Sequence, residues 1–412
     1  MIALSLDEVA RLASGSLRAG EADFVTGVQI DSRRIHPGDL FVAVGRGVEF
    51  LEDARARGAA ATLVPDDAFA AMAALGAAVR DKSNARVVGI TGSMGKTGTK
   101  DILAALCRPS ARTVAAEASF NNELGVPLTL CRLEPDTEVC IVELAMRGFG
   151  QIADLCAIAR PHVGVITNIG PVHLELVGDL AGVRRAKAEL VDALPTGGTA
   201  IVPEEFPVER EDVRVVRVGF PEDAVVEDGR TILGGVSFGF TARHQAANAA
   251  AALAALDALG LPRPARVEVP FSRWRGDELP LPGGGLLIND AYNANPVSMR
   301  AALSLLAERA GSRRRVAILG DMAELGADAP RYHREVGAAA REAGVAALVA
   351  IGPLARGYLE GAEGVQARWA PTLEEGLEVV REVVEPGDCV LVKGSRAMGL
   401  EAIADALAGV AA

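Results

Sequence analysis

The sequence predicts an α/β protein with three domains, and three observations support this prediction. From Arg86 onward, short apolar runs rich in β-branched residues alternate with Ala- and Leu-rich stretches of helical period, which is the pattern of parallel βαβ units. A Gly-rich loop directly follows the first of these runs. A second alternation of the same kind begins after Pro262 and Pro264, where a linker between domains is expected.

Length and composition agree with several globular domains. The chain has 412 residues, and domains of about 100 to 200 residues suggest two to four of them, of which three is the working number. Half of the residues are hydrophobic and the formal net charge is -12. This acidic balance argues against a nucleic-acid surface, which needs Lys and Arg to displace counterions from phosphates.

The compartment is predicted from what the sequence lacks. The N-terminus MIALSLDEVA has no basic segment followed by an apolar one, and no apolar run is long enough to span a membrane. We therefore expect a cytoplasmic protein, working as a monomer. The five cysteines are scattered without a CxxC pair, so we expect small buried side chains rather than disulfides or a zinc site.

The predicted boundaries follow the changes in pattern. Residues 1–85 form a small α/β domain, in which ARARGAAATLVPDD predicts a helix and then a strand. Residues 86–270 form a central domain with a parallel sheet, a β appendage between Pro203 and Gly239, and an Ala-rich helix at 244–261. Residues 271–412 form a second, Rossmann-like α/β domain. Its predicted strands lie in GLLINDAY, RVAILGDM, AALVAIG and CVLVKGS.

The central strands are predicted in RVVGIT (86–91), CIVELA (140–145) and VGVITNI (163–169). GITGSMGKTGTK, from Gly89 to Lys100, comes after the first of them and before a helical stretch. Glycines there let backbone N–H groups approach phosphate, Lys96 neutralises phosphate charge and Thr97 can bind Mg²⁺. The spacing is the shorter GxxGKT, anchored on Gly92, because Ile90 stands where the common longer motif has glycine.

Three other polar residues have both a plain and a functional interpretation. Glu143 lies near the end of an apolar strand, where the ligand crevice of an open α/β sheet is expected, so a metal-ligand role is favoured over an exposed edge. His173 follows VGVITNI at the same kind of edge, although a lone histidine is more often a surface or core residue. Lys187, in VRRAKAEL, reads by itself as a solvated lysine on a helix face.

Further residues stay equally open on their own chemistry. Asn248 lies one helical turn from His244, and its amide could cap the helix or face solvent. Asp290 follows a predicted strand, and Arg275 lies in FSRWRGD at the start of the last domain. Their plain interpretation is an edge carboxylate and a surface arginine, which together would form a weak salt bridge. For the three histidines outside these segments the plain interpretation is preferred: His36, His162 and His333.

The short loop TGSMGKT resembles the ATP loop of the Mur ligase family, and the resemblance extends over nearly the whole chain. DSRRIHPGDLFVAVGRG (31–47) is similar to the UDP-binding domain of members that add the third amino acid or the terminal dipeptide. Five later segments resemble the members that add D-alanyl-D-alanine, and YNANP and GDMAELG within them are the most specific. These are SFNNELGVPLTL (119–130), HQAAN (244–248), NDAYNANPVSM (289–299), LGDMAELG (319–326) and VKGSRAM (392–398).

The resemblance implies an ATP-dependent ligase that joins D-alanyl-D-alanine to a UDP-N-acetylmuramoyl-tripeptide through an acyl phosphate, in peptidoglycan precursor synthesis. ATP and two Mg²⁺ ions are the implied cofactors. Alternatives are a ligase for the third amino acid, a folylpolyglutamate-type ligase, or a non-catalytic nucleotide-binding regulator of cell-wall synthesis. The last alternative predicts loss of Lys96, Glu143 or Asp290, and all three are present.

The resemblance also implies residue roles. Lys96, Glu143, His173, Lys187 and Arg275 would be catalytic, with Thr97, Glu143, His173 and, if carbamylated by CO₂, Lys187 at the metal ions. ATP would meet Gly92, Ser93, Met94, Gly95, Lys96, Thr97, Gly98, Asn248, Arg275, Asp290, Asn293 and Asn295. The UDP-tripeptide would meet Asp31, Ser32, Arg33, Asn121 and Asn122. One segment departs from the family pattern, because residues 45–51 read GRGVEFL where a DGH-like segment is usual.

Overall fold

The computed structural model describes residues 1–20 and 22–409, and this part of the chain divides into two compact units. The first unit comprises residues 1–168, 184–241 and 245–270. The second comprises residues 169–183 and 242–244 together with the chain described from residue 271 onward. Among the helices so described, none is long and apolar enough to cross a membrane.

The first 85 residues form a small sheet with the strand order β2-β6-β5-β4, in which β2 is antiparallel to β6 and the other neighbours are parallel. The strands are β2 (Gly15–Ala19), β4 (Gly27–Gln29), β5 (Asp39–Val42) and β6 (Ala61–Pro65), with a separate antiparallel pair β1 (Leu4–Ser5) and β3 (Phe24–Val25). The helices are α1 (Leu6–Leu12), α2 (Leu51–Ala56) and α3 (Ala68–Asp81), with 3-10 turns at Ser32–Arg34 and Gly45–Phe50.

Helix α3 joins this region to the rest of the first unit. Asp67 caps its start by accepting hydrogen bonds from the backbone N–H groups of Phe69 and Ala70. The helix packs against α5 (Gly125–Leu130) and α6 (Gln151–Ala159). A Cβ atom at Gly76 would lie 2.8 Å from the Cα of Pro127, so glycine allows the two helices to approach this closely.

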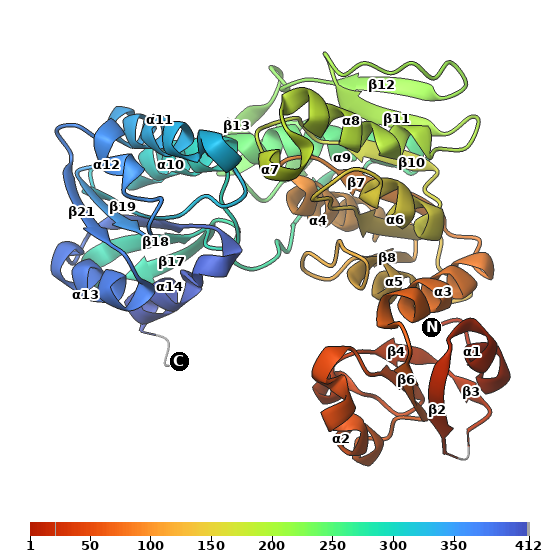
Figure 1. Cartoon of the computed structure of the whole chain (residues 1–412). Coiled ribbons are helices and arrows are strands. Elements are labelled where there is room, and N and C mark those ends of the chain that lie inside the picture. The colour runs from red at the N-terminus through yellow and green to blue at the C-terminus, as the bar shows by residue number, and fades with distance from the viewer. Residues whose placement is uncertain (21, 410–412) are drawn as a thin grey trace. The chain divides into compact units, whose positions relative to one another are not determined.

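The central sheet has the order β12-β11-β10-β7-β9-β8, and its neighbouring strands are parallel (Figure 1). Its strands are β7 (Arg86–Thr91), β8 (Thr113–Ala115), β9 (Val139–Glu143), β10 (Val163–Ile166), β11 (Thr199–Pro203) and β12 (Arg214–Val218). Its helices include α4 (Lys96–Cys107), α8 (Leu180–Asp192) and α9 (Arg243–Ala258), and α7 (Leu174–Val177) belongs to the second unit. The predicted strand 163–169 is three residues too long, because Thr167 and Asn168 turn toward the Gly-rich loop.

The β appendage predicted between Pro203 and Gly239 is only partly a separate sheet, because β12 in this range belongs to the central sheet. The separate sheet has the order β13-β14-β15-β16. Its strands are β13 (Val225–Glu227), β14 (Arg230–Leu233), β15 (Val236–Phe238) and β16 (Arg266–Val267). The two hairpins turn at Asp228-Gly229 and Gly234-Gly235, which all have positive φ. Asp-Gly and Gly-Gly pairs of this kind suit tight hairpin turns.

The second unit is built on a sheet with the order β17-β18-β22-β19-β20-β21, in which β17 alone of the described strands runs antiparallel to its neighbour. The strands are β17 (Asp277–Leu281), β18 (Gly285–Asn289), β19 (Arg315–Gly320), β20 (Ala347–Ile351), β21 (Gln366–Ala370) and β22 (Cys389–Lys393). The helices are α10 (Pro296–Ala310), α11 (Ala329–Glu342), α12 (Gly357–Gly361), α13 (Leu373–Val383) and α14 (Glu401–Ala408), with 3-10 turns at Pro282–Gly284, Gly326–Asp328 and Arg396–Met398.

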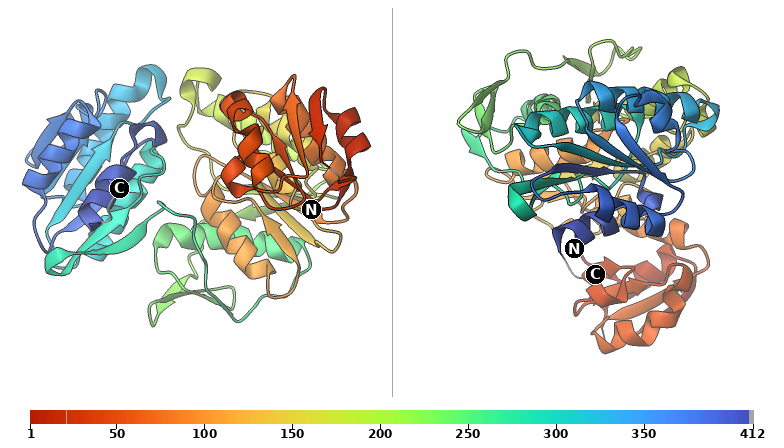
Figure 2. Two further views of the ribbon diagram at one scale, coloured as in Figure 1. Left: turned by 90° about the horizontal axis from the view of Figure 1, so that it is seen from below. Right: turned by 90° about the vertical axis from the view of Figure 1, so that its left-hand side faces the viewer.

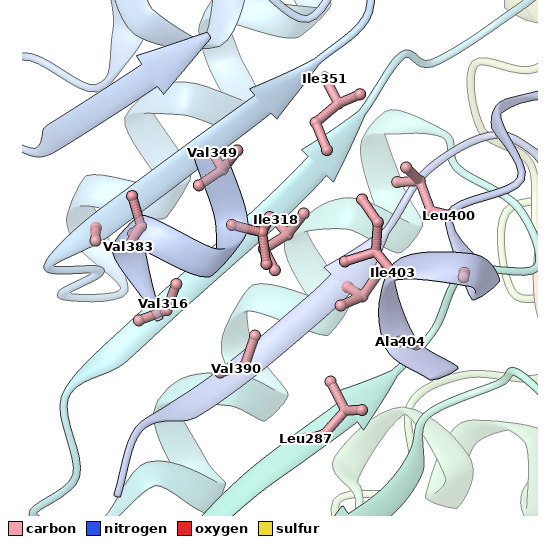
Figure 3. Close-up of a cluster of buried hydrophobic side chains, with 14 of the residues drawn as sticks. Leu287, Val316, Ile318, Val349, Ile351, Val383, Val390, Leu400, Ile403 and Ala404 are labelled. Carbon is pink, nitrogen blue, oxygen red and sulfur yellow. The ribbon is translucent and has the colours of Figure 1, made fainter. Parts of the chain in front are cut away.

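Helices cover both faces of this second sheet. Figure 1 shows α10, α11 and α12 on one face and α13 and α14 on the other, and Figure 2 shows the same layering from two further sides. On the face of α13 and α14, Val316, Ile318 and Val390 of the central strands pack with Leu400 and Ile403 (Figure 3). These β-branched and Leu side chains are buried, so the hydrophobic effect holds the helices on the sheet.

Candidate active site

The Gly-rich loop connects β7 to α4, and two of its glycines have conformations that other residues rarely adopt. Gly92 has φ +149° and Gly95 has φ +80°. A Cβ atom on Gly92 would lie 1.8 Å from Oγ1 of Thr167, and one on Gly95 would lie 2.4 Å from Oδ1 of Asn248. Only glycine therefore fits at either position, and the loop lies tightly against its neighbours.

Two residues that the sequence analysis missed hold the loop in place. The backbone N–H of Met94 donates to Oδ1 of Asn168 at 3.0 Å, and that of Ser93 donates to the Asn168 carbonyl at 3.1 Å. Thr167 donates through Oγ1 to the carbonyl of Met94 at 2.5 Å. The available signal was the polar pair directly after VGVI, since β10 is the parallel neighbour of β7.

The start of α4 has the features of an anion site. The ammonium of Lys96 donates to the Gly92 carbonyl at 2.8 Å, so it lies over the loop rather than extending into solvent. The helix macrodipole and its first unpaired N–H groups add positive potential at this end. A loop that has no room for Cβ atoms, next to a lysine and a helix N-terminus, fits the phosphates of a nucleotide.

Glu143 is fully buried at the end of β9, and both of its oxygens accept hydrogen bonds. Oε2 accepts from Oγ1 of Thr97 at 2.8 Å, and Oε1 accepts from Nδ2 of Asn121 at 2.8 Å. Within residues 1–20 and 22–409, no group of three or more His, Cys, Asp and Glu side chains could hold a metal. A hydroxyl and one carboxylate nevertheless suit Mg²⁺, which keeps several waters and completes its shell with phosphate oxygens.

Lys187 lies on α8 and is 2% exposed. Burial, and secondly the positive charge of Lys96, hold the pKa of the Lys187 ammonium well below its usual value. The plain interpretation, a solvated lysine on a helix face, is therefore wrong, and burial favours the neutral form of this amine.

Asn248 is buried in α9 and contacts the loop rather than solvent. Its Nδ2 donates to Oε1 of Gln245 at 2.8 Å, and its side chain lies beside Gly95 and Gly98. A Cβ atom at Gly98 would be 2.7 Å from Nδ2 of Asn248. The pair Gln245 and Asn248 therefore packs against the first turn of α4, and Gln245 was not predicted.

His173 belongs to the second unit, where its Nδ1 contacts Oε2 of Glu324 in the GDMAELG segment. Both residues have positive φ, +53° for His173 and +62° for Glu324. Nearby, the Gly326 N–H donates to Oε1 of Glu175 at 3.2 Å. The structure thus brings His173 together with a carboxylate of the second unit.

In the second unit, Asp290 at the end of β18 pairs with a lysine that the sequence analysis did not select. The ammonium of Lys393, 2% exposed, donates to Oδ2 of Asp290 and to the carbonyl of Asn293, both at 2.7 Å. Burial is the main cause that lowers the pKa of the neighbouring His244, with Asp290 opposing the shift and Lys393 adding to it. Lys393 therefore fixes the loop that carries Asp290 and Asn293.

The Arg275 guanidinium lies 4.2 Å from the ring centroid of Tyr292, so this arginine joins the DAYNANP loop, whereas Arg273 is exposed. Asn295 caps α10, accepting from the Ser298 N–H at 2.9 Å, while Ser298 accepts from the Asn295 N–H. The side-chain oxygen of Asn295 therefore has a structural role at the start of α10.

The residues expected at the UDP-tripeptide divide into two groups. Asp31 accepts two hydrogen bonds from the guanidinium of Arg33, at 2.9 and 2.8 Å, and Ser32 is buried beside them. Asn121 contacts Glu143, as described above, and Asn122 accepts from the Gly125 N–H at 3.0 Å, ahead of α5. A link between the groups comes from Arg34, which donates to Oε2 of Glu117 at 2.5 Å.

A tight glycine loop between a parallel strand and a helix, with lysine and a hydroxyl-carboxylate pair at the helix start, defines a P-loop nucleotide-binding protein. The comparisons with known proteins narrow this class. Residues 90–256 match the model of the Mur ligase middle domain, and residues 278–396 match that of the Mur ligase, glutamate ligase domain. The chain belongs to the Mur ligase family.

Relatives of known name and structure match the chain over its length. The UDP-N-acetylmuramoyl-tripeptide--D-alanyl-D-alanine ligase of Mycobacterium tuberculosis is 34% identical over 99% of this chain and 98% of the relative. The crystal structure of MurF from Acinetobacter baumannii has a TM-score of 0.83 at 27% identity and covers 99% of both chains. MurF ligase from Thermotoga maritima in complex with ADP has a TM-score of 0.76 at 25% identity, over 93% of this chain and 97% of that one.

Proposed function

We propose that this chain is an ATP-dependent ligase that joins D-alanyl-D-alanine to UDP-N-acetylmuramoyl-tripeptide in peptidoglycan precursor synthesis. The observation that carries the proposal is the chain of contacts Thr97–Glu143–Asn121, which connects the phosphate loop to SFNNELG. Relatives named for this reaction match the whole length of the chain at 30–34% identity, which supports the same assignment. We place the reaction in the cytoplasm and expect a monomer.

ATP would bind with its phosphates on the loop from Gly92 to Gly98, with Lys96 neutralising their charge. Thr97 and Glu143 would hold Mg²⁺, which would neutralise negative charge on the phosphoryl group as it is transferred. His173 and Lys187 are the further candidates for a second Mg²⁺. Asn248 would recognise the nucleotide base, while Arg275, Asp290, Asn293 and Asn295 of the second unit would reach the nucleotide.

The proposed chemistry has two steps. The terminal carboxylate of the tripeptide attacks the γ-phosphorus of ATP, so the bond to the β-γ bridging oxygen breaks and ADP leaves. The amine of D-alanyl-D-alanine then attacks the acyl carbon, phosphate leaves, and the amine loses a proton as the amide forms. The protein contributes positioning and charge neutralisation rather than covalent catalysis, and positioning can supply about 7 to 11 kcal/mol.

Lys187 has the properties that carbamylation requires. Its neutral amine would attack the carbon of CO₂ and lose a proton, giving an anionic carbamate near the loop. Burial and the charge of Lys96 both favour the neutral amine that this step needs. Short-chain carboxylates would then partly restore a Lys187→Ala enzyme but not a Lys96→Ala enzyme.

We assign one task to each predicted domain. Residues 1–85 would bind the UDP moiety, with Asp31, Ser32 and Arg33 at the site, and Asn121 and Asn122 would contact the tripeptide. Residues 86–270 would bind ATP. Residues 271–412 would bind the amine substrate and close on ATP.

The proposal is tested by measuring ADP release and the mass of the product with each amine acceptor in turn. We expect release only when UDP-tripeptide and a D,D-dipeptide are both present, with a product heavier by one dipeptide less water. Lys96→Ala and Glu143→Ala should each lower kcat by at least about 10²-fold, and the exposed Lys82→Ala serves as the matched control. Equal turnover of a UDP-dipeptide with a diamino acid, of a folate with glutamate, or no turnover at all, would contradict the proposal.

A further inference from the structure

Lys100 is a buried lysine on the helix of the phosphate loop, one turn beyond Lys96 and Thr97. Its side chain is 2% exposed. The ammonium donates to the carbonyls of Ala116 at 2.9 Å and Ala118 at 2.7 Å, and its Nζ lies 2.9 Å from Oδ1 of Asp101. Because an ammonium has three N–H donors, this set of acceptors offsets the loss of hydration on burial.

The two carbonyls belong to a segment without helix or strand, residues 116–122. It follows β8, which lies alongside α4 (Figure 1), and ends ahead of α5. Within it, Ala118 has φ +46°, in the left-handed region that disfavours a residue with a Cβ atom. A backbone of this kind persists only where its surroundings determine it, and the donation from Lys100 to Ala118 is such a constraint.

The same segment carries contacts to both predicted substrate regions. Asn121 donates to Oε1 of Glu143, and the Ala145 N–H donates to the Asn121 carbonyl at 2.9 Å. On its other side, Glu117 accepts from Arg34, the residue that follows Asp31, Ser32 and Arg33. Lys100 therefore contacts the backbone on either side of Glu117. The second of these carbonyls, that of Ala118, lies three residues before Asn121.

We infer that Lys100 is a positioning residue that fixes residues 116–122 against the helix of the phosphate loop, so that Glu117 and Asn121 are held for the UDP-linked peptide substrate. The inference rests on the proposed function for the identity of that substrate. The inferred role of Lys100 differs from a role in nucleotide binding, because the carbonyls of Ala116 and Ala118 lie outside the loop from Gly92 to Gly98. It also differs from general stabilisation, because it concerns one segment and one substrate.

The test compares Lys100→Met with Arg80→Met, a matched control. Arg80 is also a buried cation that donates to carbonyls, those of Ala159 at 2.9 Å and Ser83 at 3.0 Å, and these carbonyls lie outside the segment. For Lys100→Met we expect the KM for UDP-tripeptide to rise about tenfold, because a rise of this size corresponds to the loss of one charged hydrogen bond. The Kd of a non-hydrolysable ATP analogue should change less than about twofold. Arg80→Met should lower the melting temperature and leave that KM unchanged.

A second measurement does not depend on activity. Backbone amide hydrogen exchange in residues 116–122 should be faster in Lys100→Met than in the wild type and unchanged in Arg80→Met. If Lys100→Met does not fold, the double variant Lys100→Met/Asp101→Asn replaces it, because it leaves no unpaired buried carboxylate. Lys100→Arg, which keeps donors, should recover part of the exchange protection and of the KM.

The outcomes separate the inference from the proposed function. A wild-type enzyme without ligase activity overturns the proposed function, while the exchange comparison still decides whether Lys100 holds the segment. Unchanged exchange and unchanged KM in Lys100→Met overturn the inference. An equal rise of KM in Arg80→Met also overturns it, since that result would make the effect one of stability alone.

Discussion

Lys187 lies in surroundings that oppose its charge. A buried ammonium close to a second lysine is expected to destabilise the folded chain, yet a hydrophobic side chain of similar length would fit the helix face without that cost. Residues that lower stability in this way are common where function requires them. The position therefore indicates a chemical role for the amine rather than a structural one.

The stability of Lys187→Met should depend on pH in a defined direction. Because the folded-state pKa of Lys187 lies below the unfolded-state value of about 10.4, the unfolded chain binds the extra proton between these two values. Wild-type stability is thus lost as the pH falls through this window. Lys187→Met should melt at least about 2 °C higher than the wild type at pH 7, with the difference vanishing above pH 10.

This prediction is checked by thermal unfolding in buffer depleted of CO₂, and the ligase rate should fall in the same variant. A lower melting temperature for Lys187→Met at pH 7 would show that the ammonium is stabilised by its surroundings. The surface variant Lys82→Met provides the control for loss of a lysine charge.

At the scale of elements, the loop and α4 work as one piece with β10 and α9. Thr167 and Asn168 follow β10 and bind the loop backbone, while Asn248 of α9 lies beside two of the loop glycines. The conformation of the loop is therefore determined before a nucleotide arrives. Preorganisation of this kind reduces the entropy lost on binding.

Gly95→Ala should disrupt this arrangement by a clash as well as by backbone strain. We expect at least about 10²-fold weaker binding of an ATP analogue, since the new Cβ atom would lie 2.4 Å from Oδ1 of Asn248. Gly197→Ala is the matched control, with φ +77° and no atom within 4 Å of its Cβ. Gly197→Ala should lower the free energy of unfolding by about 1–2 kcal/mol, the cost of a left-handed conformation in alanine, and leave the affinity for the ATP analogue unchanged. Isothermal titration calorimetry measures the affinity of both variants for the ATP analogue. Equal affinities would contradict the prediction.

The sequence predicted several buried strands, although not the buried β11, and it did not predict the edge strands of the second unit. RVVGIT corresponds to β7 residue for residue, because its buried run of mostly β-branched residues ends directly before Gly92. Strands β17 and β21 were not predicted, since DELPL and QARWA alternate polar and apolar residues at the edges of a sheet. An edge strand needs only one partner, so its sequence carries a weak signal.

The same distinction applies to the site. Lys96, Thr97 and Glu143 follow from local patterns, a loop after a strand and a carboxylate at a strand end. Thr167 and Lys393 were missed, because their roles depend on which strands become neighbours, and one sequence does not give that order. Asn295 also belongs to a capping box, a local signal that the sequence analysis did not use, and its predicted contact with ATP stays a prediction.

At the scale of the whole molecule, the described chain has two compact units, and the ATP loop lies in the first. We therefore expect calorimetric unfolding in more than one step, with a calorimetric enthalpy larger than the van't Hoff value. ADP with Mg²⁺ should raise the unfolding temperature of the unit that contains the loop, because the ligand binds only the folded state. A single two-state transition would show that the units unfold together.

The five cysteines have a practical consequence. All are buried without disulfides, and burial raises the pKa to about 12 for Cys107, Cys131, Cys140 and Cys156 and to about 11 for Cys389. The thiolate, which is the reactive form, is therefore scarce and shielded at neutral pH. A maleimide should label almost none of the native chain and all five thiols after unfolding, as intact mass would show. Two surface cysteines introduced into the wild-type protein could therefore be labelled selectively with a dye pair. Such a pair would test whether the two units move relative to one another during turnover.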